Sequence, residues 1–330
     1  MTDGGIIPTV TRMTLTYGQF LLLFLVVPIA GLTMLVLRDR RDRRDRQRKH
    51  SRGQQTQNTT NEAQWKQAQE AWGWAPSPSP WLVLGSLVLV AVVYTAPWDN
   101  HLIAEGVWSY DPSRISGVTF GWIPLEEMLF FPLQTLLIGL WVIWLLPRLV
   151  MRRPATIGID SSIRTIEAVT LSSTESQNWE HGNGAAIMRW MAVAVGCLAW
   201  LVALILLIRN WQPGTYLGWE LVWALPPLIL QVGLGGDILW RRRRLLLAAL
   251  VPMVIYLSVA DAFAISEGIW TIAPQRSLGF LLGGVLPLEE VIFFMLTSVL
   301  VTGGLILGTG PEARKRFRRG IRGYVRRQST

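Results

Sequence analysis

One motif that could transfer protons occurs twice in the chain. The sequence Pro-Leu-Glu-Glu stands at Pro124–Glu127 and again at Pro287–Glu290, and a Phe-Phe pair follows it in both places. A carboxyl group removed from water favours its neutral, protonated form, so it can act as a general acid while a neighbouring ionised carboxylate acts as a base. The two motifs therefore predict acid–base chemistry, provided that their glutamates lie in a dry environment.

The sequence around the second copy indicates such an environment. Glu289 and Glu290 are the only charged residues between Ser277 and Gly308, and this segment is longer than one membrane span requires. A proline followed by acids would also suit an ordinary helix start. An ionisable group below the membrane surface is costly and usually functional, however, and its recurrence in a second copy favours a functional role.

Both motifs belong to a longer internal repeat, which determines the architecture. The segment from Asp99 to Phe131 aligns with the segment from Asp261 to Phe294 with one single-residue insertion. The aligned identities include Tyr94 with Tyr256, Asp99 with Asp261, Glu105 with Glu267, Trp108 with Trp270, Arg114 with Arg276, Phe130 with Phe293, and Phe131 with Phe294. Further upstream, Thr16-Tyr17 and Pro28 correspond to Thr215-Tyr216 and Pro227.

The duplicated residues form the candidate site. The predicted catalytic carboxyls are Asp99, Glu126, Glu127, Asp261, Glu289 and Glu290. The predicted supporting or substrate-binding residues are Glu105, Glu267, Arg114, Arg276, Trp108, Trp270, Phe130, Phe131, Phe293, Phe294, Tyr94 and Tyr256. Adjacent residues on a helix point about 100° apart, so Glu126 and Glu127 are expected to face different partners. Aromatic faces around buried acids suit a cationic intermediate, although any single Trp or Arg could instead mark the membrane interface.

The elements that must position these residues are membrane spans. Hydrophobic residues make up 51% of the 330 positions, charged residues only 16%, and the mean hydropathy is +0.34, whereas a soluble domain carries about 25% charged residues. The predicted fold class is all-α, a polytopic membrane bundle of seven transmembrane helices. The predicted spans are approximately 18–37, 81–98, 120–147, 189–209, 217–239, 245–261 and 280–307.

The basic residues predict the orientation in the membrane. Runs of arginine and lysine at 38–52, 241–244 and 314–327 each follow an apolar block, whereas the loops on the other side are poor in them. The N-terminus is therefore expected outside and the C-terminus in the cytoplasm. This distribution predicts contact with membrane lipid and no nucleic acid as a partner, despite the net charge of +9. The absence of an organelle-targeting signal indicates the plasma membrane.

Two parallel three-helix repeats, joined by a linker helix, account for seven spans. The extra span at 189–209 keeps both repeats in the same orientation, related by a pseudo-twofold axis along the membrane normal, so both motifs lie on the outer side. Residues 1–150 are predicted to form the first repeat, with a polar linker at 38–80. The remaining predicted parts are a polar linker and joining helix at 151–212, the second repeat at 213–310 and a basic cytoplasmic tail at 311–330.

At these residues the sequence resembles the lycopene cyclase domain family of membrane proteins. Its members are non-flavin carotenoid cyclases, which occur as heterodimers in actinobacteria and as fused tandem domains in archaea, other bacteria and fungi. The resemblance covers about 15–147 and 214–308. The motif of the family falls on Pro124, Glu126 and Glu127, and in the second repeat on Pro287, Glu289 and Glu290.

The resemblance implies an enzyme, an intramolecular lyase or isomerase that needs no cofactor. It would cyclise the linear ψ end groups of lycopene to β-rings and ultimately give β-carotene. An acid would protonate C2, the C5–C6 double bond would attack the tertiary cation at C1, and a base would remove the C6 proton. Its implied partners are the polyene substrate within the bilayer and other enzymes of carotenoid synthesis. The sequence leaves open which carboxyl is acid or base, although the heterodimeric relatives imply one site between the units.

Other functions remain as alternatives. A small-molecule carrier can have the same arrangement of three, one and three helices, but carriers place their polar residues near the midplane of several spans. Relatives that act on C50 carotenoids or make ε-rings leave the substrate and ring type open. A retinal protein needs a lysine in its last span, whereas Lys49, Lys66 and Lys315 all lie outside the spans. With one cysteine and three scattered histidines, no metal site is expected.

Overall fold

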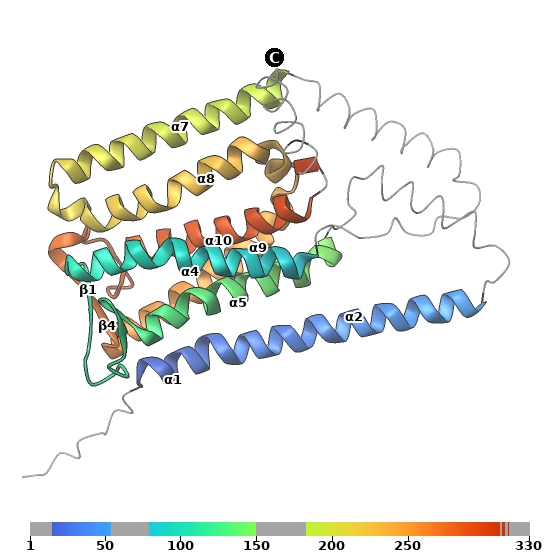
Figure 1. The fold of residues 1–330 in the computed structure, drawn as a ribbon, viewed down its shortest axis with the longest axis horizontal. Helices are drawn as coiled ribbons and strands as arrows, with labels where there is room; N and C mark the ends of the chain where they lie inside the picture. Colours follow the sequence, from blue (N-terminus) through green and yellow to red (C-terminus); the bar gives the residue numbers. More distant parts are fainter. Residues whose placement is uncertain (1–14, 54–78, 150–182, 311, 314–315, 317–330) are drawn as a thin grey trace, which may run out of the picture.

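The computed structural model describes residues 15–53, 79–149, 183–310, 312–313 and 316. Within these residues, seven helices are long and apolar enough to cross a membrane. They run side by side as a bundle (Figure 1), which confirms the predicted all-α polytopic membrane fold. Large parts of the two predicted polar linkers, and nearly all of the predicted tail at 311–330, lie outside the described residues.

Along the chain, the seven spans have the following bounds. The first span consists of α1 (Tyr17–Leu21), a π-helical stretch η1 (Leu22–Val26) and α2 (Val27–Gly53). The others are α4 (Pro80–Ala104), α5 (Leu125–Leu149), α7 (Asn183–Ile208), α8 (Thr215–Arg241), α9 (Arg243–Glu267) and α10 (Leu288–Thr309). Short 3₁₀ turns, η3 (Gln212–Gly214) and η4 (Pro274–Arg276), lie between spans.

Two spans begin later than predicted, because the apolar sequence in front of them forms β-hairpins. The first hairpin pairs β2 (Thr119–Phe120) with β3 (Ile123–Pro124), and the second pairs β5 (Leu281–Leu282) with β6 (Leu286–Pro287). The prediction of helix from 120 and from 280 was therefore wrong for these segments. Hydropathy does not separate strand from helix, and Gly121 and Gly283 turn the chain with φ angles of 67° and 59°.

Three other helices continue further than predicted. The spans predicted at 81–98 and 245–261 extend to the ends of α4 and α9, so Asp99 and Asp261 lie on helices. Hydropathy falls at these polar residues, but both carboxyls face the interior, with exposed fractions of 0% and 3%. The helix α2 likewise runs to Gly53, through the beginning of the predicted linker at 38–80.

The helices that begin with the glutamate pairs, α5 and α10, form the centre of the bundle. The first packs against α2, α4, α9 and α10, and α10 also packs against α4, α8 and α9. In contrast, α7 lies on the outer side of the bundle against α8 (Figure 1), and only 6% of the residues in its apolar segment are buried. The helix that joins the two units therefore contributes little to the core that positions the carboxyls.

The loops that follow α4 and α9 pair with each other at one end of the bundle. Strand β1 (Trp108–Tyr110) pairs antiparallel with β4 (Trp270–Ile272), with Ser109 opposite Thr271 and their hydroxyl oxygens 3.0 Å apart. Because these strands occupy corresponding places in the two aligned segments, the pairing joins the two units directly beside the duplicated motif.

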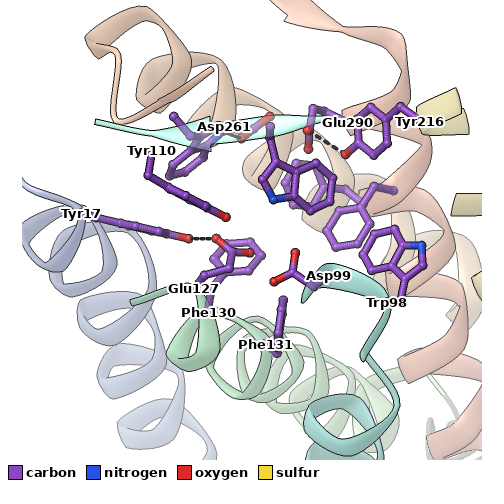
Figure 2. Close-up of a pocket in the computed structure, with 14 residues that line it drawn as sticks. Tyr17, Trp98, Asp99, Tyr110, Glu127, Phe130, Phe131, Tyr216, Asp261 and Glu290 are labelled. Carbon is purple, nitrogen blue, oxygen red and sulfur yellow. Dashed lines mark hydrogen bonds between the residues drawn. The ribbon is translucent and has the colours of Figure 1, made fainter. Parts of the chain in front are cut away.

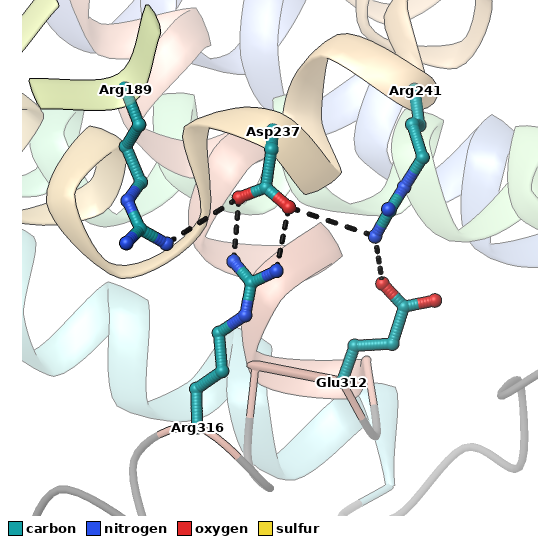
Figure 3. A network of polar contacts seen from close by, with 5 residues as sticks. All are labelled: Arg189, Asp237, Arg241, Glu312 and Arg316. Carbon is teal, nitrogen blue, oxygen red and sulfur yellow. Dashed lines mark hydrogen bonds and ion pairs between the residues drawn. The ribbon is translucent and has the colours of Figure 1, made fainter. Parts of the chain in front are cut away.

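The opposite end of the bundle gathers basic residues around one carboxylate (Figure 3). Arg316 donates to both oxygens of Asp237, at 2.5 and 2.6 Å, while Arg189 and Arg241 each have a guanidinium nitrogen 3.8 Å from the same carboxylate. Arg241 also pairs with Glu312. The network joins α7, α8 and the segment after α10, and Asp237 lies about 30 Å along α8 from Tyr216 at the motif end.

Candidate active site

The duplicated residues meet around one cavity of about 40 Å³ at the motif end of the bundle (Figure 2). Its lining consists of four carboxyls (Asp99, Glu127, Asp261, Glu290), three tyrosines (Tyr17, Tyr110, Tyr216), three tryptophans (Trp98, Trp108, Trp270) and four phenylalanines (Phe130, Phe131, Phe293, Phe294). Acid–base groups and aromatic faces thus share one small space, which has room for a few water molecules.

The two glutamates of each motif have different surroundings. Glu126 accepts a hydrogen bond from the backbone N–H of Ser116 at 2.6 Å, and Glu289 accepts the corresponding bond from Leu278 at 2.6 Å. Both side chains are buried but do not line the cavity. Since the next residue points about 100° away, the second glutamate of each motif faces the cavity. The sequence predicted different partners for the two glutamates, but not which of them faces the cavity. The first glutamates hold the loops that lead into the hairpins, and their predicted catalytic role is not supported by this geometry.

Each cavity glutamate accepts a hydrogen bond from a buried tyrosine. The hydroxyl of Tyr17 donates to Glu127, and the hydroxyl of Tyr216 donates to Glu290 at 2.8 Å. Both tyrosines stand at the start of the first span of their unit and are 1% exposed. The candidate residues selected from the sequence did not include them, although their positions correspond in the repeat, and that correspondence was the available signal.

The two aspartates differ in their partners. The indole N–H of Trp270 donates to Asp261 at 3.1 Å. Among the described residues, neither oxygen of Asp99 has a hydrogen-bond partner, although the side chain is 0% exposed. A buried carboxylate without a partner is costly. Asp99 is therefore placed as a neutral, proton-bearing group would be.

Side chains from both units build each half of the cavity. The ring of Trp270 lies 5.0 Å from the ring of Tyr17, and the ring of Trp108 lies 5.2 Å from the ring of Tyr216. This exchange follows from the pairing of β1 with β4, which carries each tryptophan toward the tyrosine of the other unit. Each half of the cavity therefore combines the tyrosine and glutamate of one unit with a tryptophan of the other.

The two halves are not chemically identical. Tyr110, in β1, stacks on Tyr17 with ring centroids 5.9 Å apart, where the second unit has Ile272. Burial raises the pKa of the Tyr110 phenol well above its ordinary value, and the Glu127 carboxyl adds to this shift. The phenol therefore stays protonated and can only be a hydrogen-bond donor toward a carboxylate. Outside the cavity lining, the second unit buries Glu220, which is 0% exposed, where the first unit has the buried Leu21.

Several of the predicted supporting residues lie outside the cavity. Glu105 and Arg276 form an ion pair between the two units at 3.3 Å, and Arg114 donates to the backbone oxygen of Leu15 at 3.2 Å. The hydroxyls of Tyr94 and Tyr256 donate to the backbone oxygens of Trp223 and Phe24, both at 2.9 Å, and Glu267 is half-buried at the end of α9. These residues connect loops and spans around the site, whereas the predicted tryptophans and phenylalanines line it.

A membrane helix bundle with a cavity lined by buried carboxyls, tyrosines and aromatic rings is typical of one class of protein, an intramembrane acid–base enzyme with an apolar substrate. The family model described as lycopene cyclase matches residues 78–145 and 215–304, which include α4, α8 and α9 and most of α5 and α10. The lycopene beta-cyclase of Halobacterium salinarum is 38% identical over 224 residues, which cover 68% of this chain and 81% of that protein. The chain belongs to the lycopene cyclase family.

Fungal relatives are longer than the matched region. The bifunctional lycopene cyclase/phytoene synthase of Podospora anserina is 32% identical over 227 residues, which cover 68% of this chain and 34% of that protein. The protein of the same name in Neurospora crassa is 32% identical over 234 residues, with coverage of 67% and 33%. No solved structure matches the chain.

The resemblance inferred from the duplicated motif is thereby confirmed. The chain is a membrane enzyme that performs an intramolecular cyclisation, of the isomerase or lyase type, and its substrate is a lipophilic carotenoid.

Proposed function

We propose that the protein converts the linear ψ end groups of lycopene into β-rings, in a single active site at the interface of the two units. The observation that carries this proposal is the arrangement of four carboxyls from both units around one aromatic cavity. Both half-sites contribute to that space, so an end group held there would be within reach of either Asp–Glu pair.

The proposed reaction adds one proton and removes another. A carboxylic acid protonates C2 of the end group, which leaves a tertiary cation at C1. The electrons of the C5–C6 double bond then form the C1–C6 bond and move the cation to C5. A carboxylate removes the C6 proton, and the C5–C6 double bond forms again as part of the ring. Electrons and protons balance without a redox partner, and the aromatic walls stabilise the intermediate cations.

The hydrogen bonds of the cavity suggest which pair performs which step. Asp99 has no hydrogen-bond partner among the described residues, so we assign proton donation to it and to the adjacent Glu127. Both cavity glutamates accept a hydrogen bond from a tyrosine, so the aspartates distinguish the pairs. Asp261 accepts a hydrogen bond from the indole N–H of Trp270, and such a bond stabilises a carboxylate. We therefore assign removal of the C6 proton to the pair in the second unit.

Expression of the chain in a bacterium that accumulates lycopene tests the proposed reaction. We expect γ- and β-carotene, identified by chromatography against standards, to replace lycopene. Unchanged lycopene in cells with well-inserted protein would contradict the assignment of lycopene as substrate. Products with ε-rings would contradict removal of the C6 proton alone.

We also propose that the motif end of the bundle faces outward, in the plasma membrane, with the N-terminus outside and the C-terminus cytoplasmic. The cluster of Arg189, Arg241 and Arg316 at the opposite end supports this orientation. This orientation is also the one expected for two parallel units, at about 1–150 and 213–310, whose motifs lie on the same side of the membrane. In a Cys197→Ser background, we expect Ser109→Cys to react with an impermeant maleimide in intact cells. The variant Arg244→Cys should react only after the cells are opened, and the reverse pattern would contradict the orientation.

A further inference from the structure

We propose that a lipid-facing groove between α4 and α8 binds the conjugated chain of the substrate while its end group occupies the carboxyl cavity. The inference rests on the proposed function, since it concerns how a carotenoid reaches that cavity. The groove has a volume of about 120 Å³ and lies among α4, α5, α8 and α10. It is distinct from the carboxyl cavity but adjoins it, because Phe131 and Phe293 line both.

The groove opens toward the bilayer, where a carotenoid dissolves. Val90 and Tyr94 line it from α4 and are 56% and 42% exposed. In a membrane-spanning helix, exposure of this kind is exposure to lipid. An apolar substrate can therefore enter from the side, between two helices, without passing through water.

The wall between groove and cavity is a set of stacked aromatic rings. The ring of Trp223 lies 4.7 Å from the ring of Trp98 and 5.9 Å from that of Phe293, with interplanar angles of 21° and 27°. Tyr94 continues the set with its ring 6.2 Å from Trp223. The rings of this set that line the groove give it an aromatic wall, against which a planar conjugated chain can pack.

Several hydrogen-bond donors of this region have partners within the protein, whereas the indole nitrogen of Trp223 and the Oε1 atom of Gln231 have none among the described residues. The indole N–H of Trp98 donates to the backbone oxygen of Trp219 at 3.0 Å. Deeper in the groove, Gln134 donates to Thr297 at 2.9 Å and Gln231 donates to the backbone oxygen of Leu300 at 2.8 Å. With these donors engaged, the groove presents mainly carbon to its occupant, which favours a hydrocarbon over a polar ligand.

The groove is long enough for part of a conjugated chain, whereas the carboxyl cavity is too small for an end group unless its wall moves. From Trp223 to Gln231, the groove follows α8 for about 12 Å, so the rest of a long polyene would remain in lipid. The carboxyl cavity, at about 40 Å³, has room for only a few water molecules. An end group therefore enters only when the side chains of the shared wall, such as Phe293, move aside.

The aligned positions in the second unit carry larger side chains. Ala91 and Thr95 line the groove, whereas the corresponding residues of α9 are Met253 and Leu257, which are 8% and 2% exposed. Beside α9, the buried side chains of Met253 and Leu257 fill the space that corresponds to the groove beside α4. The asymmetry assigns chain binding to the α4–α8 side.

This asymmetry supplies the variants that test the inference. Ala91→Met and Thr95→Leu, singly and together, place in the groove the side chains that the second unit already accommodates. Val93→Met is the matched control, because Val93 lies on the same helix, is 65% exposed and does not line the groove. Two quantities are measured at equal levels of membrane-inserted protein: the conversion of lycopene in cells, and the lycopene that the purified protein retains per chain.

We expect the double variant to lose at least about tenfold in both quantities, a change of about 1.4 kcal/mol in binding, while Val93→Met matches the unmodified protein. Full retention and conversion by the double variant would overturn the groove and leave the cyclase proposal intact. If the unmodified protein retains lycopene without converting it, the cyclase proposal fails and retention still tests the groove. If the double variant does not accumulate, the single variants decide by the same two measurements.

Discussion

Glu290→Gln is expected to lower the rate of cyclisation by about 10²- to 10⁴-fold, the usual contribution of one general acid–base group. The amide is nearly the same size and can still accept the hydrogen bond that Tyr216 donates at 2.8 Å. It cannot accept the C6 proton, however. The fold should therefore persist while deprotonation of the cyclic cation fails. Initial rates of product formation in isolated membranes, at matched protein level, measure the effect.

Glu289→Gln is the matched control for this variant. Glu289 precedes Glu290, but it accepts a hydrogen bond from the backbone of Leu278 at 2.6 Å and does not line the cavity. Glutamine retains an acceptor oxygen for that bond, so the rate should stay close to that of the unmodified protein. An equal loss of activity in both variants would contradict the division of roles within the motif.

Asp99→Asn is expected to lower the rate of cyclisation about as much as Glu290→Gln does, but to have a different effect on stability. Its carboxyl oxygens have no hydrogen-bond partner among the described residues, so the variant loses the acidic proton without breaking a hydrogen bond seen in the structure. Removal of a buried ionisable group that lacks a partner should leave stability unchanged or raise it. We expect a rate lower by about 10²- to 10⁴-fold and a thermal unfolding midpoint, measured in detergent, no lower than that of the unmodified protein.

Asp111→Asn provides the comparison for Asp99→Asn. The Asp111 carboxyl accepts from the hydroxyl of Ser113 at 2.7 Å in the loop after β1, and it is exposed and outside the cavity. Its removal should leave the rate nearly unchanged. If Asp99→Asn retained full activity, Asp99 could not be the proton donor, and the donor role would pass to Glu127.

The acids of the site could be predicted from the sequence because each is duplicated and surrounded by apolar residues. Helical geometry further predicted that Glu126 and Glu127 face different partners, and their hydrogen bonds differ accordingly. The tyrosines were missed for a physical reason. Tyrosine at the end of a membrane span is ordinary at the interface, so Tyr17 and Tyr216 were distinguished only by their correspondence in the repeat.

The two hairpins and the pairing of β1 with β4 could not be predicted from hydropathy. The residues of β5 and β6 are as apolar as the helix that follows them, although the side chains of β5 are exposed and those of β6 are buried. Strands β1 and β4 contain three residues each and pair across a large separation in sequence. Short strands of this kind leave no periodic pattern, although their pairing is what brings Trp270 to Tyr17.

The asymmetry between the units was visible in part. The sequence already placed Glu220 opposite Leu21, but the consequence of Ala91 and Thr95 aligning with Met253 and Leu257 depends on where those side chains pack. The positions become informative once the groove is known to lie beside α4 and not beside α9.

The central claim is that both units contribute to one active site, and the most direct test compares single and double variants. Initial rates would be measured for Glu127→Gln, for Glu290→Gln and for the double variant in membranes with equal amounts of protein. Residues that act as a unit show strongly non-additive losses, so we expect each single variant to be nearly as inactive as the double variant. If each single variant kept about half of the activity and only the double variant lost it, the two units would hold independent sites, contrary to this claim.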